Sequence, residues 1–217
     1  MTTPQDHSPA PADSPVEVPV TARETLRAAP IFDLVEETFT FDDDQQLTRA
    51  YLAHPGAVAV LPVDEQDRVL LIGQYRHPVR MQLWEIPAGL LDVDGEPMLE
   101  CAQRELAEEA DLQATTWHTL VDYFTTPGAS NEGIRIYLAE GISSVPDADL
   151  HTREDEEAGI VPTWVPLAEA VAAVLRGEIH NPSAVSAVLA LHAVRTGAGT
   201  LRDARAPWEH QPRGIAP

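Results

Sequence analysis

The hydrophobic and polar positions in the middle of the chain follow two different periods. Short apolar runs bounded by turn residues, at 57–63 and 69–75, are typical of buried strands. Segment 32–41, with Leu34, Phe39 and Phe41, is predicted to be a strand that forms a hairpin with 48–53. Further strands are predicted over residues 83–86, 117–124, 134–138 and 163–165.

Three segments have helical periodicity instead. In segment 97–110 the apolar residues Met98, Ala102 and Leu106 recur at every fourth position, which predicts one buried stripe. Segments 167–176 and 183–196 are also predicted to be helices. The face of 183–196 that is predicted to pack on the sheet carries Val185, Val188, Leu189 and His192. The alternation of strands and helices predicts a mixed α/β sandwich.

Both ends of the chain differ in composition from its middle. Residues 1–30 contain six prolines among small polar residues, which predicts a disordered arm, and 198–217 is expected to be a flexible tail. One domain is expected over 31–197, with N-terminal strands in 31–54 and the main α/β part in 55–197. The chain has no apolar run of about 18 residues and no secretory signal pattern, which favours a soluble cytoplasmic protein.

The charge of the chain excludes several function classes. The formal net charge is −21, and all 14 cationic side chains counted as Lys or Arg are arginine. The absence of lysine excludes Schiff-base chemistry, and the acidic balance argues against a nucleic-acid partner. The single cysteine, Cys101, excludes an internal disulfide and a thiolate metal cage.

Three carboxylates share one face of the predicted 97–110 helix. Glu105, Glu108 and Glu109 are spaced by three and four residues, so their side chains lie close together and repel one another. They also lie near the negative end of the helix dipole, where acids are unfavourable. Spacing alone leaves two readings open: a wet acidic face, or a cation-binding face.

The residues around this helix favour the second reading. Pro87, Ala88 and Gly89 come first, then Glu96, and seven residues later the run 104–109 reads Arg-Glu-Leu-Ala-Glu-Glu. This arrangement resembles the Nudix box, a long and highly specific motif. The resemblance covers roughly residues 32–197 and is closest to ADP-ribose pyrophosphatases of actinobacterial type. It implies a Nudix α/β/α sandwich with a mixed β-sheet, plus an N-terminal β-hairpin region.

The sequence departs from the family motif in two places. Six residues, 90–95, separate Gly89 from Glu96, where the general pattern has five. This insertion precedes the helix, so the spacing of the carboxylates on the helix is unaffected. Asp111 stands where the motif has a glycine just past the helix, a position that favours a left-handed conformation. Aspartate adopts that conformation at a cost of about 1 kcal/mol or less, so we expect function to be retained.

The resemblance implies a site for Mg²⁺ or Mn²⁺. Glu105 and Glu109 are expected to bind metal directly with the backbone carbonyl of Ala88, and Glu108 to be a further ligand or catalytic group. Glu96 and Arg104 are expected to support this cluster. Carboxylates and water are the ligands that these ions prefer, and bound divalent ions neutralise phosphate charge and activate water.

Other residues are candidates for catalysis and substrate binding. The resemblance implies a general base on an acidic loop downstream of the box, for which Glu156 and Glu157 are the candidates, although a merely solvated loop is also possible. Arg76 is a candidate for phosphate binding, because a guanidinium suits bidentate contact, or forms a surface salt bridge. The turn after Pro127 provides two further candidates for substrate binding, Gly128 and Ser130.

The activity that the resemblance implies is metal-dependent hydrolysis of ADP-ribose to AMP and ribose 5-phosphate. Alternatives are hydrolysis of another nucleoside diphosphate sugar or a dinucleotide, and non-catalytic sensing of ADP-ribose. The three box carboxylates and the lack of a basic module argue against a sensor. The partners predicted are a small nucleotide sugar, no nucleic acid, no membrane, and a second copy of the chain in a homodimer, the last implied by the resemblance alone.

Overall fold

The computed structural model describes residues 11–42, 45–146 and 160–211. In this part of the chain the strands are β1 (Val20–Arg27), β2 (Asp33–Asp42), β3 (Gln45–Ala53), β4 (Ala57–Pro62), β5 (Arg68–Arg76), β6 (Met81–Glu85), β7 (Ala88–Leu90), β8 (Leu112–Phe124), β9 (Gly133–Ser144), β10 (Pro162–Pro166) and β11 (Arg202–Asp203). The helices are α1 (Met98–Ala110), α2 (Leu167–Leu175) and α3 (Pro182–Arg195). Within these residues, no helix is long and apolar enough to cross a bilayer.

A five-stranded mixed sheet forms the centre of the molecule, in the order β11-β8-β9-β4-β7. β4 runs parallel to β9 and antiparallel to β7, and its residues 57–59 pair with residues 134–136 of β9 and with all three residues of β7. A second sheet, β10-β5-β6, packs beside it. The α/β class and the mixed sheet predicted from the sequence are confirmed.

The helices cover the two faces of the central sheet. One buried cluster joins α2 and α3 to residues such as Leu61, Ile136 and Leu138, and the other joins α1 to Val58, Val60 and Tyr137. Because successive side chains of a strand point to opposite faces, β4 and β9 contribute to both clusters. This alternation gives the α/β/α layering and places α1 against β4 and β7.

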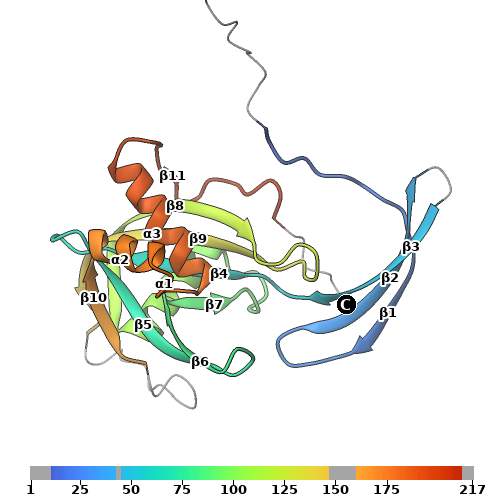
Figure 1. Ribbon diagram of the computed structural model, residues 1–217, viewed down its shortest axis with the longest axis horizontal. Helices are drawn as coiled ribbons and strands as arrows, with labels where there is room; N and C mark the ends of the chain where they lie inside the picture. The colour runs from blue at the N-terminus through green and yellow to red at the C-terminus, as the bar shows by residue number, and fades with distance from the viewer. Residues whose placement is uncertain (1–10, 43–44, 147–159, 212–217) are drawn as a thin grey trace, which may run out of the picture.

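The N-terminal strands form a sheet of their own, in the order β1-β2-β3 (Figure 1). This sheet projects from the side of the α/β body and joins it where β3 leads into β4 (Figure 1). The predicted hairpin therefore has a third strand. The prediction of disorder through residue 30 is wrong for residues 20–27, which pair with β2 although every residue of β1 is exposed.

Two other predictions are corrected by the structure. The tail expected over 198–217 contains β11, which pairs with β8 at Thr119 and His118. Helix α3 buries a different face from the one predicted: only Val188 of the expected residues is buried, and Leu189 is 36% exposed. The buried residues of α3 are Ser183, Ala184, Ala187, Val188 and Leu191. Small side chains on this face allow α3 to lie close to the sheet.

Candidate active site

Helix α1 directs one of its glutamates onto the backbone of β7. Glu109 is only 6% exposed, and its Oε2 accepts a hydrogen bond of 2.9 Å from the N–H of Ala88. The helix ends at Asp111, whose φ of 56° is left-handed, as expected where the motif has glycine. The insertion in loop 90–95 therefore leaves the contact between the helix and β7 intact.

Gly89 brings β7 equally close to Glu105. A Cβ atom at position 89 would overlap the Cγ, Cδ and Oε1 atoms of Glu105. With Glu105 in this rotamer, only a glycine at position 89 leaves room for the carboxylate, and any larger residue would displace it. Ala88, Gly89, Glu105 and Glu109, which are 21 or fewer residues apart in sequence, thus meet at one place.

Arg104 links the remaining acidic residues of the motif. Its guanidinium donates to Glu96 from Nε and Nη2 at 3.1 and 3.0 Å, and Nη1 donates to Glu105 and Glu108 at 2.5 and 3.1 Å. The hydrogen bonds with Glu96 raise the pKa of Arg104, and the same bonds lower the pKa of Glu96. These contacts fit the supporting role predicted for the pair, which stays a prediction.

Cys101 lies next to this hydrogen-bond network, and its thiol is not reactive. It is fully buried; its thiol donates to the carbonyl of Leu90 at 3.4 Å and accepts from Arg104 Nη2 at 3.4 Å. Burial raises the pKa of Cys101 to about 12, so the thiol stays protonated at neutral pH. It therefore does not supply a nucleophile. Its contacts instead join α1 to the end of β7.

The carboxylates and the backbone of β7 form a donor set suited to a hard divalent cation. The positively charged guanidinium of Arg104 already forms salt bridges with the carboxylates of three glutamates, Glu96, Glu105 and Glu108. The space left by the missing side chain of Gly89 is filled by a carboxylate rather than by apolar packing. Among the described residues, no group of three acidic, histidine or cysteine side chains is arranged to hold a metal ion by itself, so the backbone carbonyl of Ala88 and water would complete the ligands. The oxygen donors fit such an ion.

Arg76, the candidate for phosphate binding, is held by a buried glutamate. Its Nε and Nη2 donate to the two oxygens of Glu85 at 2.9 and 2.8 Å, and Glu85 is 3% exposed. The Arg76 side chain remains 43% exposed. Glu85 ends β6, three residues before Ala88 along the chain.

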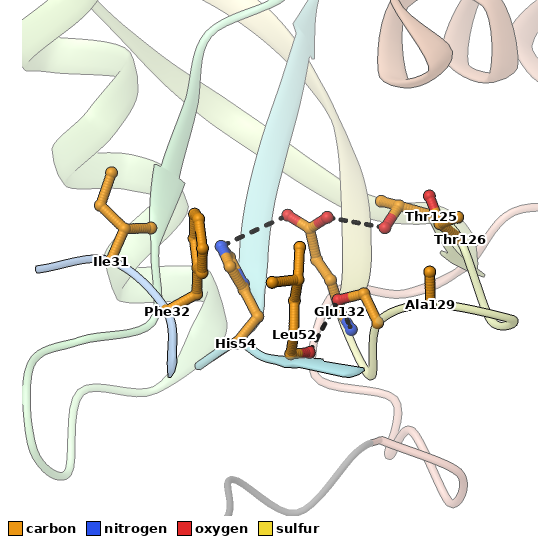
Figure 2. A pocket seen from close by; sticks show the side chains of 9 residues that line it. Ile31, Phe32, Leu52, His54, Thr125, Thr126, Ala129 and Glu132 are labelled. Carbon is orange, nitrogen blue, oxygen red and sulfur yellow. Dashed lines mark hydrogen bonds and ion pairs between the residues drawn. The ribbon is translucent and has the colours of Figure 1, made fainter. Parts of the chain in front are cut away.

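A cavity of about 300 Å³ lies where the N-terminal sheet meets the α/β body (Figure 2). Glu132 is its central polar group: Oε2 accepts from Thr125 at 2.6 Å and Oε1 lies 3.5 Å from His54 Nε2. Figure 2 shows Ile31 and Phe32 on one side and the loop 125–132 on the other. The nine lining residues are Ile31, Phe32, Leu52, His54, Thr125, Thr126, Ala129, Ser130 and Glu132.

Of the turn residues expected to bind substrate, Ser130 lines this cavity and Gly128 does not. The Ser130 hydroxyl donates to the carbonyl of Leu52 and accepts from the N–H of Glu132, so it fixes the loop against β3. In the central sheet, Ala57 of β4 pairs with Leu90 of β7 on one side and with Ile134 of β9 on the other. The loop 125–132 immediately precedes β9, on which Ile134 lies.

Some functional candidates lie outside the structural description, and others were not identified from the sequence. Glu156 and Glu157, the candidates for the base, are not among the described residues. Sequence analysis missed Glu85, His54 and Glu132. A buried charge such as that of Glu85 gives no periodic signal, and the pair His54–Glu132 joins residues that are distant in sequence. Only the position of Glu85, just before the Ile-Pro-Ala-Gly run, pointed to a role.

A family model described as the NUDIX domain matches residues 53–186, which include the carboxylate cluster, Arg76 and the loop 125–132. The chain belongs to the Nudix family. The family resemblance predicted from the box residues is thereby confirmed. Members of this family require divalent metal cations, which agrees with the donor set around Ala88.

Curated relatives of this Nudix chain share most of its length. An ADP-ribose pyrophosphatase of Mycobacterium tuberculosis is 44% identical over 89% of this chain and 92% of its own. An ADP-ribose pyrophosphatase of Bacillus subtilis is 30% identical over 77% and 88%. A GDP-mannose pyrophosphatase of Yersinia enterocolitica is 32% identical over 69% and 78%.

A solved structure agrees with the fold. The crystal structure of an ADP compounds hydrolase superposes with a TM-score of 0.70 at 21% identity, over 87% of this chain and 99% of the other. At this level of identity the match bears on the fold alone. It agrees with the α/β/α sandwich described above.

Proposed function

We propose that this Nudix protein hydrolyses the pyrophosphate bond of ADP-ribose, giving AMP and ribose 5-phosphate. The observation that carries the proposal is the close meeting of Glu105 and Glu109 with the backbone of Ala88 and Gly89, held from the side by Arg104. The choice of ADP-ribose as the substrate is supported by the relatives named ADP-ribose pyrophosphatase, since they match the chain over most of its length.

The residues of the site have complementary tasks. Bound Mg²⁺ or Mn²⁺ would neutralise the phosphate oxygens and lower the pKa of a water molecule. Glu105, Glu109 and the Ala88 carbonyl would hold the cations, with Glu108 as a further ligand. Arg104 and Glu96 would hold the carboxylates in position, because the Arg104 guanidinium forms hydrogen bonds with Glu96, Glu105 and Glu108 at the same time.

The remaining parts of the substrate would lie between the carboxylate cluster and the cavity of Figure 2. Arg76 would contact a phosphate from its place on Glu85, and the loop with Gly128 and Ser130 would border the sugar or base. The face of Phe32 offers a flat apolar wall for a ring. We further propose that the protein acts in the cytoplasm as a homodimer without nucleic-acid partners.

A panel of substrates tests the proposed specificity. With Mg²⁺ and separately with Mn²⁺, ADP-ribose is expected to give a kcat/KM at least about tenfold above those of GDP-mannose, ADP-glucose and a dinucleotide, because the proposed site recognises both the adenosine and the ribose 5-phosphate parts. GDP-mannose is included because some relatives are named for it. A higher kcat/KM for any of the others would replace ADP-ribose as the substrate. Binding of ADP-ribose without turnover would favour a sensor.

The general base is tested by single substitutions in the acidic run of residues 154–157. We expect one of the variants Glu156→Gln and Glu157→Gln to lower kcat by about a hundredfold or more, as general bases contribute 10²–10⁴-fold. Because the base need not bind metal, the apparent affinity for Mn²⁺ should stay within about twofold of wild type. Glu154→Gln in the same run is the comparison. If neither variant loses turnover, the base lies elsewhere in the protein.

A further inference from the structure

The segment 201–208, which we call the C-terminal strap, is fixed along the outer side of β8. The hydroxyl of Thr119, which is fully buried, donates to the carbonyl of Asp203 at 3.0 Å. Farther along β8, Arg202 donates to Asp122 at 2.8 Å. Arg205 reaches Glu100 on α1 at 2.7 Å, and this hydrogen bond lowers the pKa of Glu100. The strap therefore connects the sheet with the helix that carries the carboxylates.

Arg135 of β9 is the buried centre of these contacts. It is 3% exposed and forms a bidentate pair with Asp122 of β8 at 2.8 and 2.9 Å. Burial opposes its charge, yet the hydrogen bonds with Asp122 raise the pKa of Arg135. Its Nη1 donates to the strap carbonyl of Ala206 at 2.7 Å, and Trp208 covers the guanidinium at 5.7 Å. A buried cation needs such partners, so the strap completes its environment.

Trp208 of the strap also contacts Phe124, the residue just before the loop 125–132 that lines the cavity. The Trp208 ring lies 6.0 Å from the ring of Phe124, tilted by 35°. Phe124 ends β8, pairs with Gly133 of β9, and is followed directly by Thr125 and the rest of the loop 125–132. Five residues of this loop line the cavity of Figure 2.

We infer that Trp208 is a positioning residue for the substrate cavity, acting through Phe124 and, with Arg135, on the paired ends of β8 and β9. Residues 129–131 of the loop are fixed to β3, because Leu52 N–H donates to Ala129 at 2.9 Å and Asn131 N–H donates to Leu52 at 3.3 Å. The other end of the loop follows Phe124 directly, so the position of Thr125 and Thr126 depends on how the end of β8 is held. The part of the inference that concerns substrate rests on the proposed function.

The test compares two tryptophans that each lie over an arginine side chain. Trp208→Ala is expected to raise the KM for ADP-ribose about tenfold with kcat within about threefold, because a misplaced loop weakens binding more than chemistry. Trp208→Phe, which keeps a ring against Phe124, should restore the wild-type KM. Trp164→Ala is the control: Trp164 packs over Arg68 at 5.9 Å, much as Trp208 packs over Arg135, but on β10. It should leave KM unchanged.

A second measurement does not depend on activity. Amide hydrogen exchange of the full-length Trp208→Ala protein should be at least about tenfold faster at residues 125–132 than in wild type. Exchange in α2 should be unchanged. Unchanged exchange in the loop would overturn the inference, as would a loss of thermal stability in Trp208→Ala with no change in KM. Altered exchange with no ADP-ribose turnover by wild type would retain the positioning role and refute the proposed substrate.

Discussion

Replacing Glu109 with glutamine is expected to lower kcat for ADP-ribose by at least about a hundredfold, as removal of transition-state charge stabilisation commonly does. Glutamine keeps an oxygen that can accept the hydrogen bond from Ala88, now 2.9 Å long. The change therefore removes one negative charge and leaves the contact between α1 and β7. Turnover measured with saturating ADP-ribose and increasing Mg²⁺ separates a loss of metal affinity from a loss of chemistry.

The control for Glu109→Gln is Glu169→Gln, a glutamate on the exposed face of α2. This variant removes the same charge far from β7 and should have wild-type turnover. Thermal unfolding of both variants shows whether each remains folded. If Glu109→Gln is folded and as active as wild type, Glu109 is not a metal ligand, and the proposed task of the cluster is wrong.

The helix that carries the carboxylates could be predicted from sequence because the spacing of its apolar residues and the motif residues around it agree. The apolar positions of 97–110 set the register of the helix, and that register alone places Glu105 and Glu109 on one face. The motif residues before the helix added Ala88 and Gly89. The reason for glycine at position 89 became clear only from the approach of the Glu105 carboxylate, which depends on tertiary packing.

The strands missed at the two ends have weak sequence signals for physical reasons. β1 is exposed throughout, so its pairing with β2 rests on backbone hydrogen bonds and leaves no alternation of buried and exposed side chains. β11 is two residues long and is held mainly by Thr119 and Asp122 of β8. Arginines in the tail indicated a loose segment, whereas Arg202 pairs with a carboxylate that is distant in sequence.

The error in α3 has a different cause. The helix has apolar residues on most of its circumference, so hydrophobicity alone does not select the packed face. Size selects it: alanines at 184 and 187 are fully buried, while Leu189 faces outward. The pairing of Glu132 with His54 was likewise unpredictable, because an ion pair between residues so distant in sequence follows from the fold and not from local spacing.

Gly89→Ala tests the geometry of the site rather than its charge. The added methyl group would overlap the Glu105 carboxylate, so either Glu105 or β7 must move. We expect kcat to fall by about a hundredfold, since small misplacements of catalytic groups have effects of that size. Overpacking also destabilises proteins, typically by about 1–3 kcal/mol, so a moderate fall in thermal stability is expected.

The matched control is Gly199→Ala, where a Cβ atom meets nothing within 4 Å and activity should be unchanged. Titration with Mn²⁺, followed by its electron paramagnetic resonance signal, should show weaker binding in Gly89→Ala than in Gly199→Ala, because displacement of Glu105 removes a ligand from the site. Combining Gly89→Ala with Glu105→Ala should then cost little beyond Gly89→Ala alone, since the two changes affect one carboxylate. Wild-type turnover and Mn²⁺ binding in Gly89→Ala would show that the observed position of Glu105 against β7 is not the one used in catalysis.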